Sequence, residues 1–349
     1  MTFTIQGRPV DLGHRPLIIA ELSGNHGGSL ATALELVDAA AAAGADAIKL
    51  QTYTADTMTI DVDLPDFRID DPESLWSGCT LHALYERAHT PWDWHEPIFS
   101  RARSHGLIAF STPFDSTSVA FLETLDVPCY KIASFEIVDI PLIRRVASTG
   151  RPMIMSTGMA TLEEIDEAVT AAREAGCQEL LLMKCTSTYP APPAASRLSG
   201  IPLLRERYGC EVGLSDHTLG VGVAVASVSL GATAIEKHLV MSRDSGAVDG
   251  AFSLEPHELR LLVDETARAH ESIGTPDFGP TEVEVPSLRF RRSLYFVRDV
   301  AAGTEVTAED VRAIRPGFGL APRHLDDVIG RRARVDQARG TPVSWTDLT

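Results

Sequence analysis

Lysine is scarce in this sequence of 349 residues, since only four of its 31 lysine and arginine residues are lysine. Cysteine is scarce as well: five cysteines at irregular spacings fit neither a disulfide framework nor a CxxC zinc site. No apolar run reaches the length of a membrane-spanning helix. The opening residues MTFTIQGRPVDLG lack the pattern of a signal peptide. We therefore expect a cytoplasmic, globular protein that is not embedded in a membrane.

Positive charge is also in short supply. The formal net charge is −17, while 44% of the residues are hydrophobic. A field of that sign disfavours nucleic acid and anionic membranes as partners. Any site for an anionic small molecule must then be a local concentration of cations and backbone N–H groups.

The four lysines share one sequence context. Each lies at the end of a short apolar run that is typical of a buried parallel strand. Lysine offers a compact ammonium group on a flexible stem, where arginine offers a planar fork. For any single lysine, chance explains this context as well as function does. The same context at all four lysines favours an anion site, with phosphate as the first candidate ligand. The runs are AIKLQT (Lys49), YKIASFE (Lys131), LLMKCTSTYP (Lys184) and IEKHL (Lys237).

Apolar strand patterns alternate with helical patterns from residue 17 to about residue 273. Eight such units predict an α/β fold, a (β/α)8 barrel, over residues 1–273. An open doubly wound sheet is the rival, but GxGxxG is absent after the first strand. Segment 55–91 interrupts the alternation, and we expect it to fold over the barrel mouth. The predicted strands are 17–21, 47–52, 107–112, 129–134, 152–157, 179–186, 211–216 and 232–239.

A second unit follows the predicted barrel. Residues 274–288 are rich in proline, glycine and acidic residues, which indicates a linker. Residues 289–349 contain an internal repeat, in which 299–311 echoes 336–348. Gly303 and Gly340 mark matching turns between short strands. We expect a small, mostly-β domain that docks on a barrel, either its own or that of a neighbouring subunit.

The carboxyl ends of the predicted strands carry polar side chains, and active sites of barrel enzymes lie at that end. Two lysines there, Lys49 and Lys131, predict an anion cradle. Ammonium groups neutralise charge, while hydroxyl groups fix the oxygens in place. Serine and threonine at strand ends also cap helices, so no single hydroxyl is decisive. The candidate hydroxyl groups are those of Thr112, Ser134, Ser156, Ser187 and Ser215.

Two histidines, His217 and His238, end the last two predicted strands. Neutral imidazoles at neighbouring strand ends can hold one divalent metal and leave positions open for water and substrate. Such an open site would act as a Lewis acid on a carbonyl group. A hydrogen-bonded core pair is the alternative interpretation of the two rings. Glu21, close to the barrel axis, is a candidate general base.

Taken together, these strand ends resemble the sialic acid synthase family. The second unit is similar to the family's antifreeze-like SAF domain, which has a β-clip fold. Within the family, AELSGNH, KIASFE, KCTSTYP and the segment SLWSGCTLHALYERAHTPWDWH are most similar to pseudaminic acid synthases. The matching stretches are IIAELSGNHGGS, AIKLQTYTAD, FSTPFD, YKIASFE, MSTGMAT, KCTSTYPAP, GLSDHTLG, IEKHL and RSLYFVRDVAAGTEVTAEDVRAIRPGFGL.

The resemblance implies condensation of phosphoenolpyruvate with the open-chain form of 2,4-diacetamido-2,4,6-trideoxy-altrose, an N-acylated amino sugar. It implies Mn²⁺ or Mg²⁺ on His217 and His238, and phosphoenolpyruvate on the cradle of lysines and hydroxyl groups. Arg315, in RPGFG, resembles the arginine that reaches a partner's active site in a domain-swapped homodimer. The residues that would face the sugar or the attacking water are Glu21, Gln51, Glu136, Tyr189, Asp249 and Arg315.

Three alternatives stay open at this point. An N-acetylneuraminate or legionaminic acid synthase would use the same chemistry on N-acetylmannosamine or on its 2,4-diacetamido analogue. A Schiff-base pyruvate aldolase would use Lys184 instead of a metal. A sugar-binding protein built on a barrel without catalysis is the third.

Overall fold

The computed structural model describes residues 3–72 and 74–349. The chain divides into two compact units, one that ends at Gly274 and one that spans Thr275–Thr349. The predicted linker of residues 274–288 spans the boundary, since Gly274 ends the first unit and residues 275–288 begin the second, and its separate status stays a prediction.

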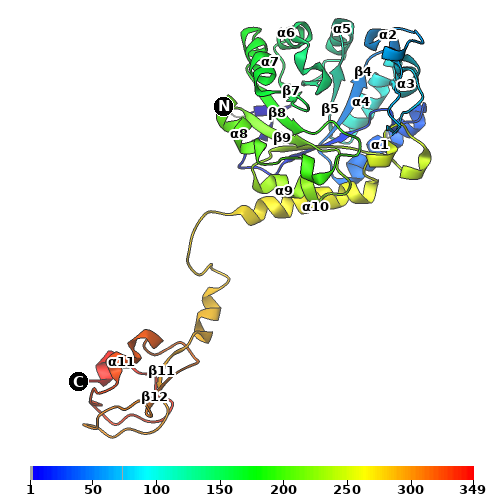
Figure 1. The fold of residues 1–349 in the computed structure, drawn as a ribbon. Helices are drawn as coiled ribbons and strands as arrows, with labels where there is room; N and C mark the ends of the chain where they lie inside the picture. The colour runs from blue at the N-terminus through cyan, green and yellow to red at the C-terminus, as the bar shows by residue number, and fades with distance from the viewer. Residues whose placement is uncertain (1–2, 73) are drawn as a thin grey trace. The chain divides into compact units, whose positions relative to one another are not determined.

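Eight parallel strands close into a barrel in the first unit, and helices surround them (Figure 1). The strands follow one another around the barrel in chain order, and the last one, β10, pairs with the first, β3. The predicted (β/α)8 barrel is therefore confirmed. The strands are β3 (Leu17–Glu21), β4 (Ala47–Thr52), β5 (Ile108–Pro113), β6 (Tyr130–Ile132), β7 (Met153–Ser156), β8 (Leu180–Cys185), β9 (Glu211–Ser215) and β10 (Ala234–His238).

The helices of the first unit begin and end where local chemistry allows. At α1 (Leu30–Ala43), the Ser29 hydroxyl accepts from Thr32 N, and Gly44 ends the helix in the left-handed region. At α7 (Leu162–Glu174), Thr161 and Glu164 form a capping box. The other helices are α2 (Ala55–Met58), α3 (Leu81–Ala88), α4 (His95–Ser104), α5 (Ser116–Thr124), α6 (Ile140–Ala147), α8 (Gly200–Tyr208), α9 (Gly222–Ser229) and α10 (Pro256–Ile273).

Segment 55–91 inserts α2, a 3-10 turn (Pro65–Phe67) and α3 between β4 and α4. Two short helices therefore occupy the segment that the sequence marked as a break in the strand–helix alternation. Trp76 ties it to the loop that follows β10, because the indole Nε1 donates to Val248 O at 3.0 Å. The segment thus reaches the carboxyl-terminal side of the barrel.

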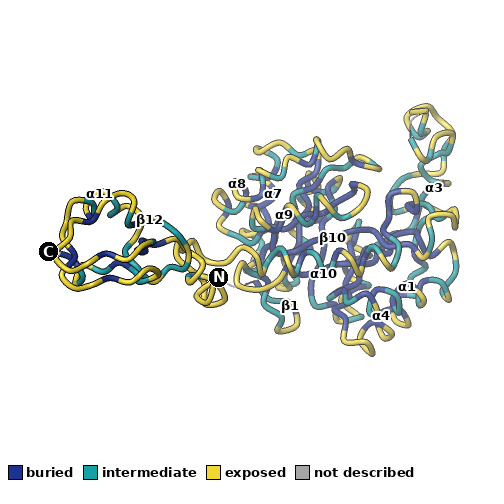
Figure 2. Tube along the Cα trace, turned by 90° about the horizontal axis from the view of Figure 1, so that it is seen from below, coloured by how far each residue is buried: buried dark blue, intermediate teal, exposed yellow. Residues whose placement is uncertain are grey.

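Two apolar layers fill the barrel. One lies between strands and helices; the other is inside the strands, where a hairpin of β1 (Phe3–Ile5) and β2 (Arg8–Val10) packs its apolar side chains. Figure 2 shows the barrel strands as the buried centre of this unit. The interior members from the hairpin and strands are Phe3, Ile5, Val10, Leu17, Ile19, Ala47, Ile108, Phe110, Cys129, Ile154, Leu181, Met183 and Ala234.

Toward the carboxyl ends of the barrel strands, the side chains that point into the barrel become polar. Along β3, Leu17 and Ile19 belong to the inner cluster, so Glu21 has the same inward register. Along β10, Ala234 belongs to the inner cluster, and Glu236 and His238 follow at the same spacing. The closed, apolar end of the barrel therefore supports a polar, ionisable mouth.

The second unit contains β11 (Ser293–Phe296), β12 (Val311–Ile314) and the short helix α11 (Leu325–Val328). The two copies of the predicted repeat contact each other through matching atoms. Ala302 N donates to Asp336 Oδ1 at 2.7 Å, and Arg339 N donates to Asp299 Oδ1 at 2.8 Å. Because each partner stands 37 positions from its equivalent, the copies form a local pseudo-twofold arrangement.

The turns of this unit need glycine. Gly303 and Gly340 have φ of 77° and 93°, a region that favours glycine, and they occupy equivalent positions in the two repeats.

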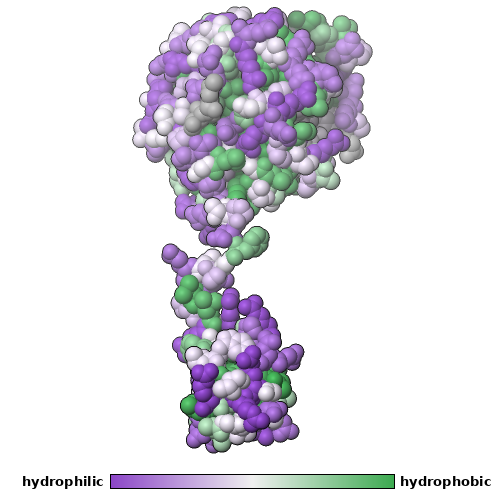
Figure 3. Space-filling view, turned by 90° about the vertical axis from the view of Figure 1, so that its left-hand side faces the viewer, coloured by the Kyte–Doolittle hydropathy of each residue, from purple (hydrophilic) through white to green (hydrophobic). Residues whose placement is uncertain are grey.

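Figure 3 shows hydrophobic residues among hydrophilic ones on the visible face of the unit. Phe318 is 67% exposed and Phe290 57%. Among the residues described, no helix combines the length and apolar character that a membrane span requires.

Candidate active site

Lys49 lies inside the barrel mouth between two carboxylates. Its Nζ pairs closely with Glu21 Oε2, lies 3.7 Å from Glu236 Oε1, and donates to Thr112 Oγ1 at 3.2 Å. Lys49 is 3% exposed. Strands β3, β4, β5 and β10 bring these groups together, because each places an inward side chain at its carboxyl end.

Lys131 joins the same cluster from β6. Its Nζ donates to Ser156 Oγ at 2.6 Å and lies 3.8 Å from Glu236 Oε1. Ser215 Oγ donates to that same Oε1 at 3.2 Å. Glu236 therefore links both ammonium groups and one predicted hydroxyl group. Its other oxygen, Oε2, has no hydrogen-bond partner within the described part of the chain.

The pKa values in this cluster follow from burial and charge. Burial alone would raise the pKa of Glu236, but Lys131 and Lys49 outweigh it and hold that pKa below its usual range. Burial raises the pKa of Glu21 although Lys49 opposes the rise. Burial also lowers the pKa of Lys131. The Glu236 carboxylate thus opposes the loss of charge from Lys131, and Glu21 and Glu236 together oppose it at Lys49.

Ser134 and Ser187 meet beside a glycine. Gly158 N donates to Ser134 Oγ at 3.1 Å. A Cβ at position 158 would come within 2.3 Å of Ser187 Oγ and 2.7 Å of Ser134 Oγ. Position 158 therefore requires glycine, because any Cβ would displace the two hydroxyl groups from this place.

His217 and His238 face each other at the ends of β9 and β10. Their ring centroids are 5.4 Å apart. Thr186 O lies 2.9 Å from His217 Nδ1 and fixes that ring through one nitrogen. His238 Nδ1 is buried without a hydrogen-bond partner in the described structure, and Asp249 Oδ2 lies 3.7 Å away. Burial lowers the pKa of His238 well below its usual value, so this imidazole is neutral.

A polar network connects the mouth of β3 to the loop after β10. Glu21 Oε1 accepts from Gln51 Nε2 and from Ser23 N, both at 3.1 Å. Ser23 Oγ in turn donates to Asp249 Oδ2. Asn25 Oδ1 accepts from Asp249 N at 3.2 Å. The predicted sugar-facing residues Glu21, Gln51 and Asp249 therefore belong to one connected set.

Aromatic rings border the histidine pair. Tyr189, which follows β8, has its ring centroid 4.6 Å from that of His217, and Phe252 lies 4.9 Å from His238. Trp76 lies 5.7 Å from Tyr189. The mouth thus has a cationic and hydroxyl-rich part on β4 to β7 and an aromatic part beside the histidines.

Lys184 and Lys237 stay out of the anion cradle. Lys184 Nζ donates to Cys185 O at 2.8 Å, and its stem lies beside Gly200 at the start of α8. Lys237 Nζ donates to Asp216 Oδ2 at 2.8 Å and to Thr218 O at 2.6 Å. Lys237 takes the outward position expected next to the inward His238 on an alternating strand.

The last two predicted residues, Glu136 and Arg315, lie outside the hydrogen-bonded network described above. Glu136 sits in a 3-10 turn (Phe135–Val138) after β6, and burial raises its pKa to about 7. Its Oε2 is buried and has no hydrogen-bond partner in the part of the chain described. Arg315 belongs to the second unit, directly after β12.

Glu236, which lies near both lysines, was not among the predicted site residues. Its position on the strand could have indicated it, because Glu236 stands two residues before His238 and so shares its face of β10. Ser23, Gly158, Trp76 and Phe252 were also missed. Their contributions come from loop geometry, which alternation along a strand does not describe.

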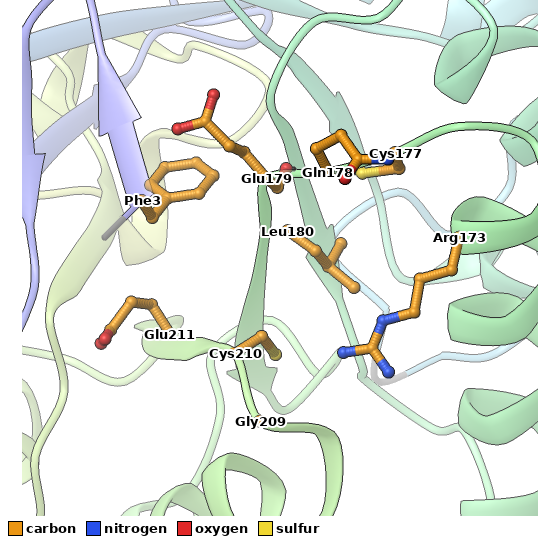
Figure 4. Close-up of a pocket in the computed structure, with 9 residues that line it drawn as sticks. All are labelled: Phe3, Arg173, Cys177, Gln178, Glu179, Leu180, Gly209, Cys210 and Glu211. Carbon is orange, nitrogen blue, oxygen red and sulfur yellow. Dashed lines mark hydrogen bonds between the residues drawn. The ribbon is translucent and has the colours of Figure 1, made fainter. Parts of the chain in front are cut away.

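A pocket of about 390 Å³ lies at the opposite end of the barrel (Figure 4). It opens at the amino ends of β8 and β9, whereas active sites of such barrels lie at the carboxyl ends. None of the predicted site residues lines it. The lining residues are Phe3, Arg173, Cys177, Gln178, Glu179, Leu180, Gly209, Cys210 and Glu211.

The histidine pair can be tested as a metal site from its own atoms. The buried His238 Nδ1 offers a free lone pair, and the bond from His217 Nδ1 to Thr186 leaves Nε2 available. Residues 3–72 and 74–349 contain no group of three or more histidine, cysteine, aspartate or glutamate side chains placed to enclose a metal. The pair therefore fits an open two-histidine site with remaining positions for water and substrate oxygens.

Comparisons with known proteins cover nearly the whole chain. Residues 36–277 match the NeuB family, and residues 291–349 match the SAF domain. A pseudaminic acid synthase from Campylobacter jejuni is 42% identical over 331 residues, which span 95% of this chain and 96% of that protein. An N,N'-diacetyllegionaminic acid synthase from Legionella pneumophila is 35% identical over 338 residues, which span 95% and 94%.

The fold has solved counterparts. The crystal structure of an N-acetylneuraminic acid synthetase from Leptospira borgpetersenii, in complex with citrate, superposes with a TM-score of 0.73 at 30% identity. The match covers 83% of this chain and 96% of that one. The sequence and structure comparisons therefore agree on the type of protein.

Proposed function

This chain belongs to the NeuB family and carries a SAF domain, and on that premise we propose that it acts as a pseudaminic acid synthase. It would condense phosphoenolpyruvate with the open-chain aldehyde of 2,4-diacetamido-2,4,6-trideoxy-altrose. C3 of phosphoenolpyruvate attacks the aldehyde carbon, and water adds at C2. The C–O bond to phosphate then breaks, giving a nine-carbon 2-keto sugar acid and phosphate. The carrying observation is the pair of buried ammonium groups beside the histidine pair at one barrel mouth.

Lys49 and Lys131 would bind the carboxylate and phosphate of phosphoenolpyruvate. Both Nζ atoms already contact a hydroxyl group, Thr112 and Ser156, which can donate to substrate oxygens. Ser134, Ser187 and Ser215 would complete the cradle. Gly158 N–H donates to Ser134 Oγ, which leaves the Ser134 hydroxyl hydrogen to donate to a substrate oxygen. Clustered cations stabilise the charge that develops on this anionic substrate as the new bond forms.

His217 and His238 would hold the divalent cation, Mn²⁺ or Mg²⁺. When bound, the cation would polarise the sugar aldehyde. The two rings are prepared for this by the chain itself, since Thr186 O orients His217 and burial keeps His238 neutral. The identity of the metal is part of the proposal.

Glu136 would exchange the proton of the water that adds at C2, because its pKa of about 7 suits a group that is half ionised near neutral pH. Glu21, the candidate general base, would face the sugar or the attacking water, and Gln51, Tyr189 and Asp249 would bind the sugar hydroxyl and amide groups. Their support is the connected network from Gln51 through Glu21 and Ser23 to Asp249.

Arg315 would act on the sugar bound in a partner's barrel, within a domain-swapped homodimer. Three apolar side chains that follow β6, β7 and β9 are exposed, as expected if another domain covers the barrel mouth. Phe135 is 57% exposed, Met159 60% and Leu219 62%. A docked SAF domain would remove such side chains from water. We place the enzyme in the cytoplasm, where its five free cysteines stay reduced.

Phosphate release tests the proposal. The full chain is incubated with phosphoenolpyruvate, Mn²⁺ and one sugar at a time: the 2,4-diacetamido trideoxy sugar, its legionaminic-type analogue, or N-acetylmannosamine. We expect turnover with the first. Turnover with N-acetylmannosamine alone would make the chain an N-acetylneuraminate synthase. No release with any sugar would overturn the proposed function.

The aldolase alternative has its own assay. Borohydride trapping of a lysine adduct, with activity that survives EDTA, would favour a Schiff base on Lys184. The structure gives that mechanism little support, because Lys184 Nζ donates to a carbonyl group of its own strand and the Lys184 stem lies beside Gly200 of α8.

A further inference from the structure

Three aromatic side chains form a continuous surface at the mouth, here named the aromatic wall: Trp76, Tyr189 and Phe252. Trp76 and Tyr189 have ring centroids 5.7 Å apart, and Tyr189 and Phe252 are 5.1 Å apart. The three come from segment 55–91, from the loop after β8 and from the loop after β10. Local sequence pattern alone does not bring them together.

The aromatic wall ends on the histidine pair. Tyr189 lies 4.6 Å from His217, and Phe252 lies 4.9 Å from His238, measured between ring centroids. Phe252 is 2% exposed and forms the floor. Trp76 and Tyr189 are half-buried, so each keeps ring surface that is open to a ligand.

Trp76 offers an apolar surface because its polar atom is already occupied. The indole Nε1 donates to Val248 O at 3.0 Å, next to the predicted sugar residue Asp249. A tryptophan whose N–H is bonded to the backbone presents only hydrocarbon to a further partner. The same bond holds the ring in place over Tyr189.

We propose that Trp76 is a specificity-determining residue that packs on the methyl groups of a 6-deoxy, di-N-acylated sugar. This inference rests on the proposed function, which places the sugar aldehyde at His217 and His238. The sugar chain beyond the aldehyde must then pass the surface that borders those rings. Acetamido methyl groups and a C6 methyl group gain from apolar contact, whereas hydroxyl groups at the same positions lose water without a hydrogen bond.

Ligand binding tests this inference without turnover. The open-chain alditols of the trideoxy diacetamido sugar and of N-acetylmannosamine lack the aldehyde, so they bind without reacting. Calorimetric titration of the full chain with Mn²⁺ gives a Kd for each alditol and hence a selectivity ratio. Trp76→Ala should lower the ratio about ten-fold, the scale of a lost apolar contact in a substrate pocket. Trp76→Phe should restore part of it, and the KM for phosphoenolpyruvate should not change.

Trp92→Ala is the matched control. Trp92 is also half-buried, its Nε1 also donates to a backbone carbonyl, Tyr53 O at 3.2 Å, and its ring stacks on Phe121 at 4.6 Å instead of on the aromatic wall. Its ratio should equal that of the unchanged protein. An unchanged ratio in Trp76→Ala, or an equal loss in Trp92→Ala, would overturn the inference. An unchanged protein that binds neither alditol and releases no phosphate would instead overturn the proposed function.

Discussion

Lys49 and Lys131 form the proposed anion site of a protein whose net charge is −17. Both ammonium groups are buried, and Glu236 lies within 3.8 Å of each. An isolated buried ammonium group would lose its proton, so the nearby carboxylate is what keeps the site cationic. The long-range field of the protein matters little at such short distances.

Lys131→Met should weaken phosphoenolpyruvate binding. The variant loses a charge-assisted hydrogen bond of about 1.5–3 kcal/mol, which corresponds to a rise in KM of roughly ten- to hundred-fold. Steady-state phosphate release at varied phosphoenolpyruvate measures it. Lys184→Met is the control, because Lys184 lies against α8, and its KM should stay unchanged. Equal KM values for both variants would remove Lys131 from the cradle.

Glu136 predicts a pH dependence of catalysis. Burial raises its pKa to about 7, so the carboxylate form dominates above that pH and is lost as the pH falls through it. If the carboxylate acts as a base, kcat/KM should fall below pH 7, and Glu136→Gln should lose this limb along with most activity. The measurement is the pH profile of both proteins. An identical limb in Glu136→Gln would assign the titration to another group.

Individual site residues could be predicted where their residue type is rare in this sequence or where they end a predicted strand. Lysine occurs four times, so Lys49 and Lys131 were conspicuous, and the histidines ended neighbouring strands. Glu236 was not conspicuous, because acidic residues are common here and its value depends on two lysines from other strands. Trp76 was recognised only as part of a family-like segment, since its contact with Tyr189 crosses more than a hundred residues.

The ends of β9 and β10 are locked by a buried ion pair behind the histidines. Lys237 Nζ contacts Asp216 Oδ2, and these two residues are the chain neighbours of His238 and His217. The side chains are 1% and 2% exposed. Lys237 also donates to Thr218 O, which fixes the loop that follows His217. The pair thus sets the spacing of the two strand ends.

Lys237→Met should destabilise the barrel strongly. Removing one partner of a buried ion pair leaves an uncompensated charge, at a cost of about 3–5 kcal/mol. Urea unfolding measures the loss. Arg260→Met provides the comparison, because Arg260 pairs with Asp264 on the exposed side of α10 and such pairs contribute about 0–1 kcal/mol. Equal losses in the two variants would contradict the role of the Lys237 pair.

The elements themselves were largely predictable. All eight barrel strands were found, although β6, β7, β8 and β10 are shorter than predicted at both ends. Apolar runs extend into turns, so hydrophobic pattern marks a strand better than it marks its last residue. Segment 55–91 was harder, because α2 and α3 are short and take their place from tertiary contacts such as the bond from Trp76 to Val248.

At the scale of the complete molecule, the second unit carries the internal repeat and Arg315. The repeat was readable because its copies share residues at a spacing of 37, and it folds through reciprocal bonds such as Ala302 to Asp336. The site of action of Arg315 was not readable from composition or periodicity. Only the family resemblance implies the place of Arg315 at a partner's barrel, and that place stays a prediction.

Subunit mixing tests the domain-swapped arrangement. His238→Ala and Arg315→Ala should each be nearly inactive, the first at the histidine pair and the second in sugar binding. After subunit exchange, a mixed dimer has one barrel with an intact histidine pair that receives an intact Arg315. An equal mixture should therefore recover about a quarter of the unmixed activity in a random dimer distribution. A mixture no more active than its components would indicate that Arg315 serves its own chain or no site.

The shielding of the lysines has a practical result. Lys49, Lys131 and Lys237 are 1–3% exposed, and Lys184 is half-buried. Reagents that acylate side-chain amines should leave the surface of the folded protein almost untouched. Any slow labelling of Lys131 then reports transient opening of the barrel mouth, and occupancy by an anion should protect it. Because lysine is so scarce here, amine labelling can follow the barrel mouth without a background from surface side chains.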